Sequence, residues 1–217
     1  MAKTGFLYDD VFLKHQTPEW HPESPDRLKS IIKLLKSSEI WQKLIHIPPR
    51  KAAFEDIETV HAKKYVDRMK SFTGYADPDT YVSTGSLEAA LFAAGAVMEA
   101  IDRCKSGEIE NAFCAVRPPG HHAEADRAMG FCIFNNVAVG ARYAQKIGYK
   151  KVFIIDFDVH HGNGTQHIFE KDGSVFYFST HQHPHYPGTG SPEEKGVGNV
   201  LNIPMPPGSG EQEYIDA

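Results

Sequence analysis

The chain has 217 residues, of which 41% are hydrophobic and 24% charged, which is enough for one sizeable domain with a buried core. Its net charge of −5 gives no support to a nucleic-acid-binding surface, and no apolar run reaches membrane-spanning length. The three cysteines form no CxxC pair, and the N-terminus lacks the apolar stretch of an export signal. These features predict a single cytoplasmic domain over residues 1–217, with no membrane or direct nucleic-acid partner.

The N-terminal third reads as a short strand followed by helices. Residues 5–8 predict a strand, and a helix is expected from Pro25, with Ser24 as its N-cap. Helical spacing defines a buried face made of Leu28, Ile31, Ile32 and Leu35. Arg27 lies beside that face, and on sequence alone a snorkelling surface arginine is favoured. Residues 54–72 predict one or two short helices, in which His61 is expected to be structural.

The next segment predicts a polar loop and then a long helix. Residues 74–86 show no clear secondary structure, and Asp77 and Asp79 are most simply turn residues. Long loops above a site also carry substrate contacts, so both remain candidates. Ser86 is expected to cap an alanine-rich helix that runs from Leu87 to near Gly107.

A second apolar strand, residues 111–116, leads into a turn that ends in His121 and His122. Two prolines and a glycine largely fix the backbone of this turn. Alone, a His-His pair is weak support for a site, but beside a metal it is a pre-positioned acid/base pair. Residues 137–147 then predict a helix closed by Gly148.

The remaining elements alternate between strand and helix. Strands are expected from residue 152, over 174–179 and over 200–203, with a helix over 164–172 and another starting after residue 208. This order predicts a mostly parallel sheet with right-handed crossovers.

The most informative segment is residues 151–164, KVFIIDFDVHHGNG. If its strand continues to His160, then Asp156, Asp158 and His160 point to the same side at the carboxyl end of the strand. A lone D-x-D is also found in magnesium sites, helix N-caps and solvated loops, but the added histidine favours a zinc-like metal. Eight of the 12 histidines lie between His121 and His185, which points to one site.

Five motifs, in this order, carry a family resemblance: HPESPDRL, RPPGHHA, GFCIFNN, DFDVHHGNGTQHIF and HPHYPGTG. Together they resemble the zinc-dependent histone deacetylase superfamily, which includes acetylpolyamine amidohydrolases and acetoin-utilisation proteins. The asparagine of HHGNG and the segment DTYVSTGSLEAA make the chain more similar to the class II branch. The resemblance implies an arginase/deacetylase-like α/β fold, with helices on both faces of the sheet and the site at its carboxyl edge.

The same resemblance assigns roles to the polar residues. Asp158 and His160 would bind zinc. His122 would be the general base and acid, and His121 its electrostatic partner. Asp156 would hydrogen-bond His121, and Asn163 would face His122.

The resemblance also implies ion and substrate contacts. A potassium site would involve Asp156, Asp158, His160, Ser179 and Thr180, and a second alkali-ion site matches more loosely Phe169, Asp172, Val175 and Asn199. Phe131 and Tyr186 would line the acyl-lysine tunnel, with the carbonyl of Gly130 beside them. Asp79 would lie at the rim, and Arg27 near the acetate exit.

The chain departs from the family pattern in two places. The family's third zinc ligand, an aspartate, and its catalytic tyrosine have no counterpart here, so the C-terminal part of the domain is expected to be missing. The leading prediction is a zinc amidohydrolase acting on acetyl-lysine in proteins or on acetylpolyamines, impaired or inactive as this chain alone. A catalytically dead binding module is the alternative. A di-manganese, arginase-like hydrolase is a third possibility, which the D-x-D-x-H pattern disfavours.

Overall fold

The computed structural model describes residues 2–217. Its elements follow in chain order: β1 (Thr4–Leu7), η1 (Asp10–Lys14), α1 (Pro25–Lys36), η2 (Trp41–Lys43), β2 (Ile45–Ile47), α2 (Phe54–Ile57), α3 (Lys63–Met69), β3 (Gly74–Tyr75), β4 (Tyr81–Val82), α4 (Ser86–Ser106), β5 (Asn111–Cys114), α5 (Asn136–Lys146), β6 (Val152–Asp156), α6 (Asn163–Phe169), β7 (Val175–Gln182), β8 (Val200–Met205) and α7 (Glu211–Asp216). η1 and η2 are 3-10 helices.

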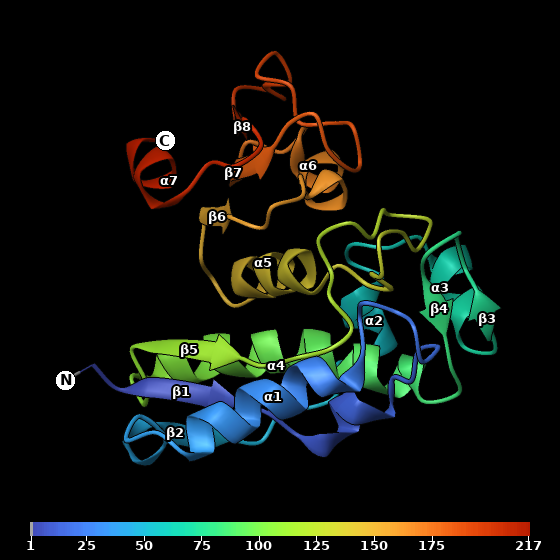
Figure 1. Cartoon of the computed structure of the whole chain (residues 1–217), viewed down its shortest axis with the longest axis vertical. Helices are drawn as coiled ribbons and strands as arrows, with labels where there is room; N and C mark the ends of the chain where they lie inside the picture. The colour runs from blue at the N-terminus through green and yellow to red at the C-terminus, as the bar shows by residue number, and fades with distance from the viewer. Residues whose placement is uncertain (1) are drawn as a thin grey trace.

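The strands form two parallel sheets and one short hairpin. The N-terminal sheet has the order β2-β1-β5, and the C-terminal sheet has the order β6-β7-β8. Helix α5 lies between the two sheets and contacts both α4 and β6 (Figure 1). The predicted α/β fold with parallel strands is therefore confirmed, and the sheet is divided into two three-stranded parts.

Helix starts and ends follow local sequence. Ser24 precedes α1 in extended conformation with Pro25 at the first helical position, as predicted, although the Ser24 hydroxyl makes no capping hydrogen bond. Helix α4 ends at Gly107, whose φ of 77° is the left-handed conformation that favours glycine. Ser86 is the first residue of α4 rather than its cap, because its hydroxyl accepts a hydrogen bond from the Ser83 amide.

Apolar burial explains how α1 and α4 pack. Leu28 and Ile32 of α1 share one hydrophobic cluster with Phe6 of β1 and with alanines of α4. Ile31, expected on the buried face of α1, is 38% exposed instead. Gly95 lets α4 approach the backbone of Arg50, because a Cβ there would clash with the Arg50 carbonyl oxygen.

The segment expected to be an unstructured loop contains a hairpin. Strands β3 and β4 pair antiparallel, with Tyr75 opposite Tyr81 and their rings 5.1 Å apart. A two-residue strand is too short to show an alternating pattern in sequence, which is why the polar composition concealed it. Within residues 2–217, no helix is long and apolar enough to cross a membrane.

Candidate active site

The first polar pair of the site joins the loop after β5 to the end of β6. His121 Nδ1 lies 2.9 Å from Asp156 Oδ2, and it must donate because an ionised carboxylate accepts only. Burial opposes protonation of His121, but the hydrogen bond and charge of Asp156 outweigh it and raise the pKa of the imidazole. The Tyr177 hydroxyl also donates to Asp156 Oδ2, at 3.0 Å. Asp156 therefore favours a charged His121.

The second pair places a neutral imidazole beside the first. His122 Nδ1 lies 2.8 Å from Asn163 Oδ1, at the start of α6, and the two histidine rings are 4.0 Å apart. Burial and then the charge of His121 lower the pKa of His122 to about 4. Two adjacent histidines thus have opposite tendencies: one is poised to hold a proton and its neighbour to accept one.

Asp158 and His160 meet in a turn rather than on a strand. The condition that the strand continues to His160 is not met: β6 ends at Asp156, whose Oδ1 accepts the Asp158 amide at 3.2 Å and turns the chain. Asp158 Oδ1 nevertheless lies 2.9 Å from His160 Nδ1. Their side chains are 50% and 35% exposed. The Asp158 carboxylate and the His160 imidazole are therefore both accessible as possible metal ligands, and they line the same cavity.

This pair fits part of a zinc site. Carboxylate oxygen and imidazole nitrogen are ordinary zinc ligands, and their convergence would suit a shared cation. Across residues 2–217, however, no group of three His, Cys, Asp or Glu side chains is arranged to hold a metal ion. A catalytic zinc needs three protein ligands, so a third donor has to be supplied to these two.

One cavity of about 570 Å³ collects most of the predicted site residues. It is lined by Pro22, Glu23, Arg27, Asp79, Pro119, His121, His122, Gly130, Phe131, Asp158, His160 and Tyr186. Arg27 lines this cavity, 3.7 Å from Glu23, and its side chain is 58% exposed, so it is also the surface arginine that the sequence favours. Segments more than 150 residues apart in sequence therefore meet around one space.

Two aromatic side chains border the cavity next to the histidines. The Tyr186 ring lies 5.1 Å from the His122 ring at 84°, and the Phe131 ring lies 4.8 Å from the His21 ring. Phe131 has a φ of 69°, unusual for a residue with a side chain, and its amide donates to Thr80 Oγ1 at 2.9 Å. The loop before β4 thus fixes one aromatic wall.

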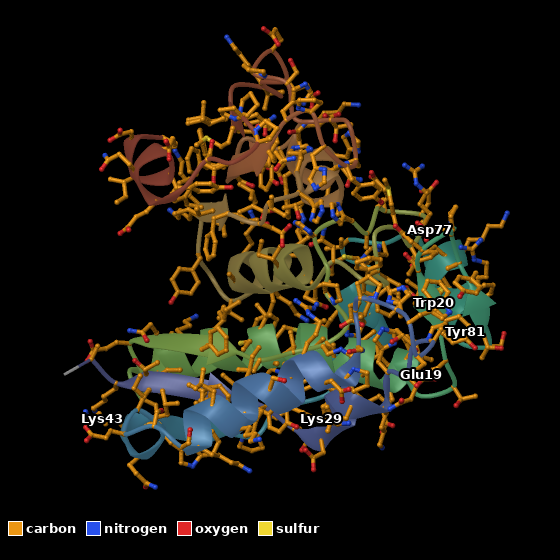
Figure 2. The ribbon with its side chains drawn as sticks, in the orientation of Figure 1. Glu19, Trp20, Lys29, Lys43, Asp77 and Tyr81 are labelled. Atoms are coloured by element: carbon orange, nitrogen blue, oxygen red, sulfur yellow. The ribbon has the colours of Figure 1, made fainter. Side chains whose placement is uncertain are left out.

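Asp79 is held at the rim by the loop between β3 and β4. Asp77 Oδ1 accepts the amides of Asp79 and Thr80, at 3.1 and 2.6 Å, so Asp77 is the turn residue that the sequence suggested. Burial and the neighbouring Asp77 raise the pKa of Asp79. Figure 2 shows Asp77, Trp20 and Tyr81 on the β3–β4 side of the molecule, where the Trp20 side chain is exposed.

The residues matched to potassium sites lie in or next to the strands of the C-terminal sheet. Ser179 and Thr180 are buried in β7, and Ser179 pairs in register with Asp156. At the second group, carbonyl oxygens of Phe169, Asp172 and Val175 converge on one point. Asn199 Nδ2, a donor, lies there at 2.7 to 3.0 Å from each oxygen. The side-chain nitrogen of Asn199, rather than its side-chain oxygen, therefore faces these carbonyl oxygens.

Two residues that position this site, Glu124 and Tyr177, are not predicted from the sequence, and a third, His61, is the structural histidine that the sequence does predict. Glu124 accepts a hydrogen bond from Asn163 Nδ2 at 2.6 Å, and Tyr177 supports Asp156 from the neighbouring strand. His61 Nδ1 donates to the Glu124 carbonyl at 2.8 Å, while its Nε2 accepts the Asn135 amide at 2.9 Å. Glu124 could have been noticed as a carboxylate two residues after His122, but its partner is 39 positions away.

Comparison with known proteins was made against a family model and against relatives. Residues 21–217 match the model described as the histone deacetylase domain. A probable deacetylase of Archaeoglobus fulgidus is 40% identical over 98% of this chain and 62% of its own length. Histone deacetylase 5 of Arabidopsis thaliana is 39% identical over 99% of this chain and 37% of its own.

A solved structure resembles the fold closely. The crystal structure of the HDA15 HD domain matches with a TM-score of 0.89 and 39% sequence identity. The match covers 94% of this chain and 62% of that one. The chain therefore spans less than two thirds of these relatives' length.

Proposed function

The chain belongs to the histone deacetylase family, and from this premise we propose that it is part of a single zinc-dependent deacetylase domain. The reaction would be hydrolysis of the acetyl amide of acetyl-lysine in proteins or of acetylated polyamines. The observation that carries the proposal is one cavity in which His121, His122, Asp158 and His160 face the aromatic pair Phe131 and Tyr186.

Asp158 and His160 would hold the metal together with a third donor. When bound, zinc supplies a Lewis acid that polarises an amide carbonyl and lowers the pKa of water. Potassium, bound through Asp156, Asp158, His160, Ser179 and Thr180, would stiffen the same turn.

Proton transfer falls to His122. With Nδ1 bonded to Asn163, its Nε2 carries the lone pair that takes a proton from the attacking water. The same nitrogen later gives that proton to the leaving amine. His121, paired with Asp156, contributes a positive charge next to this exchange, which opposes premature protonation of His122.

The aromatic walls explain a preference for a slender substrate. Phe131 and Tyr186 would contact the methylene stem of an acetylated amine and exclude water from the reacting end. Asp79, at the rim of the cavity, would accept a hydrogen bond from the substrate backbone, and Arg27 would lie beside the departing acetate.

The test is acetate release from an acetyl-lysine peptide and from N-acetylspermidine, with zinc added and then chelated. Two proteins are compared: the 217-residue chain, and a chimera that continues past Ala217 with the matching part of the Archaeoglobus relative. We expect no turnover by the first, because residues 2–217 bring no third metal donor to Asp158 and His160, and zinc-dependent turnover by the second. His122→Gln in the chimera should lower kcat by about 10²- to 10⁴-fold, the usual contribution of a general base.

Other outcomes separate the alternatives. A chimera that binds acetyl-lysine peptide but never releases acetate would favour a catalytically dead binding module. Zinc-dependent turnover by the 217-residue chain would overturn its proposed inactivity. The ratio of kcat/KM for the two substrates decides between proteins and polyamines.

A further inference from the structure

A carboxylate lies behind Asn163, on the side away from His122. Glu124 is 7% exposed, and its Oε1 lies 2.6 Å from Asn163 Nδ2 and 2.8 Å from His167 Nδ1. Arg127 approaches the same oxygen at 3.6 Å. Three donors from separate positions thus converge on one buried oxygen.

The backbone of Glu124 is fixed as well as its side chain. Its amide donates to the Arg127 carbonyl at 3.0 Å, and its carbonyl accepts from His61 Nδ1 at 2.8 Å. Because both backbone groups and the carboxylate are bonded, Glu124 has little freedom to move away from Asn163.

The chemistry of the carboxylate decides which way the Asn163 amide points. An ionised carboxylate accepts only, so Asn163 must turn its Nδ2 donor toward Glu124. Its Oδ1 then faces His122, and a neutral His122 must carry its hydrogen on Nδ1 to donate to that oxygen. The ring's Nε2 is left with a free lone pair.

The remaining neighbours of Nδ2 are weak. The His122 carbonyl and Met129 Sδ lie 3.4 and 3.5 Å from Asn163 Nδ2, at the limit of a hydrogen bond. Without the carboxylate, the amide could rotate by half a turn and present Nδ2 to His122. That rotamer selects the Nε2–H tautomer, whose Nε2 cannot accept a proton.

We propose that Glu124 is a positioning residue: acting through Asn163, its carboxylate holds His122 in the Nδ1–H tautomer that leaves Nε2 free to act as a base. The catalytic meaning of that tautomer rests on the proposed deacetylase function, whereas the tautomer itself is a property of this chain. The two are therefore tested separately.

The direct test is NMR of the metal-free 217-residue chain with ¹⁵N-labelled histidine, at a pH above the ordinary imidazole pKa. Two-bond and three-bond ¹H–¹⁵N correlations distinguish a protonated from an unprotonated ring nitrogen, and the signals missing in His122→Gln assign the ring. The wild type should show Nδ1 protonated and Nε2 unprotonated.

Two variants separate acceptor chemistry from packing. Glu124→Met keeps the length of the side chain and removes the acceptor, so the His122 signals should move to a mixture of both tautomers. Glu124→Gln keeps one carbonyl oxygen that accepts from Asn163 Nδ2, so it should retain the Nδ1–H tautomer. The matched control is Glu194→Met. It removes a carboxylate that accepts a hydrogen bond from Gln166, which lies in α6 together with Asn163, and it should leave the His122 signals unchanged.

A pure Nδ1–H tautomer in Glu124→Met, with a native circular dichroism spectrum, would overturn the proposal. So would shifts in Glu124→Gln and Glu194→Met as large as those in Glu124→Met, which would indicate a general structural effect. If Glu124→Met does not fold, Glu124→Ala, which also removes the acceptor, takes its place in the same comparison.

The functional reading is tested in the chimera. Glu124→Met should lower kcat by about ten- to a hundredfold, a part of the general-base contribution, with little change in KM. Glu124→Gln should restore most of it. A tautomer change in a chimera that has no acetate release in any form would refute the proposed function and leave the positioning role standing.

Discussion

Two ion pairs of this molecule lie at the same cavity and differ in what surrounds them. Arg117, directly before the two prolines of the loop after β5, forms a two-point ion pair with Glu23, and both residues are at most 2% exposed. Asp158 and His160 form the other pair, with side chains 50% and 35% exposed. The first pair is almost fully buried, and the second is open to solvent.

This difference in exposure separates an ion pair that supports the fold from an ion pair that is open to a ligand. Glu23 also accepts from His15, and Arg117 donates to the Phe12 carbonyl at 3.1 Å, so both residues have further partners within the protein. Burial raises the pKa of Glu23, but hydrogen bonds from His15 and Arg117 outweigh it and lower the value to about 2. Such a pair ties the loop after β5 to η1 and to the segment before α1, whereas the exposed pair can exchange a neighbour for a ligand.

Cutting the buried pair should have the largest effect. Arg117→Met leaves the Glu23 carboxylate buried without its main partner, and we expect the free energy of unfolding to fall by about 3–5 kcal/mol. Denaturant unfolding of the 217-residue chain measures it. The double change with Glu23→Met should recover most of the loss, and a single-variant loss below about 1 kcal/mol would contradict the comparison.

The second effect is pH-dependent and concerns His61. Burial lowers its pKa to about 4, against hydrogen bonds to the Glu124 and Ala125 carbonyls that would raise it. The unfolded chain therefore binds the proton first: the stability contributed by neutral His61 is complete above pH 6.5 and is lost as pH falls from 6.5 through 4. The loss is about 3 kcal/mol.

The difference between wild type and His61→Gln isolates this term, because other buried histidines titrate in both proteins. Denaturant unfolding from about pH 7.5 to about pH 4 should show a steeper decline for the wild type. Parallel curves of unfolding free energy against pH would show that His61 contributes nothing to the loss of stability in acid.

The third prediction introduces a second charge next to the buried Glu124 carboxylate. Asn163→Asp sets a second carboxylate against Glu124, and the free energy of unfolding should fall by about 2 kcal/mol. Adding Glu124→Gln supplies an amide donor to the new carboxylate at position 163 and should recover most of the loss, which a double-mutant cycle measures. Additive losses would mean that the two side chains do not interact.

The smallest effect on stability should come from the exposed pair itself. Asp158→Asn is expected to change the free energy of unfolding by less than about 1 kcal/mol, because exposed ion pairs contribute little. In the chimera, the same substitution should abolish the rise in Tm that zinc produces by binding the folded state. A large loss of stability in the metal-free protein would place Asp158 with the buried pair instead.

The elements that sequence predicted correctly are those with strong local signals. Proline at the first position of α1 and glycine at the end of α4 are read from adjacent residues, as is the apolar run of β6. The fold class followed from the order of these elements, and it is confirmed.

What sequence missed depends on contacts between distant residues. The end of β6 is set by the Asp156 carboxylate accepting the Asp158 amide, and alternation along a strand cannot reveal such a turn. Glu124 carries no local signal of its role, because α6 brings Asn163 to it only in the folded chain. The division of the sheet into two parts, with α5 contacting β6 on one side and α4 on the other, is likewise not encoded by any single segment.

The left-handed backbone of Phe131 has a consequence for how this protein could be altered. Such a conformation costs a residue with a Cβ roughly 1–2 kcal/mol, and the hydrogen bond from its amide to Thr80 holds it in place. Glycine or asparagine would adopt it more easily, so thermostability screens should enrich Phe131→Gly or Phe131→Asn. These variants would lack the aromatic wall of the cavity. Selection for heat resistance would therefore favour glycine or asparagine at position 131, whereas selection for turnover would favour phenylalanine.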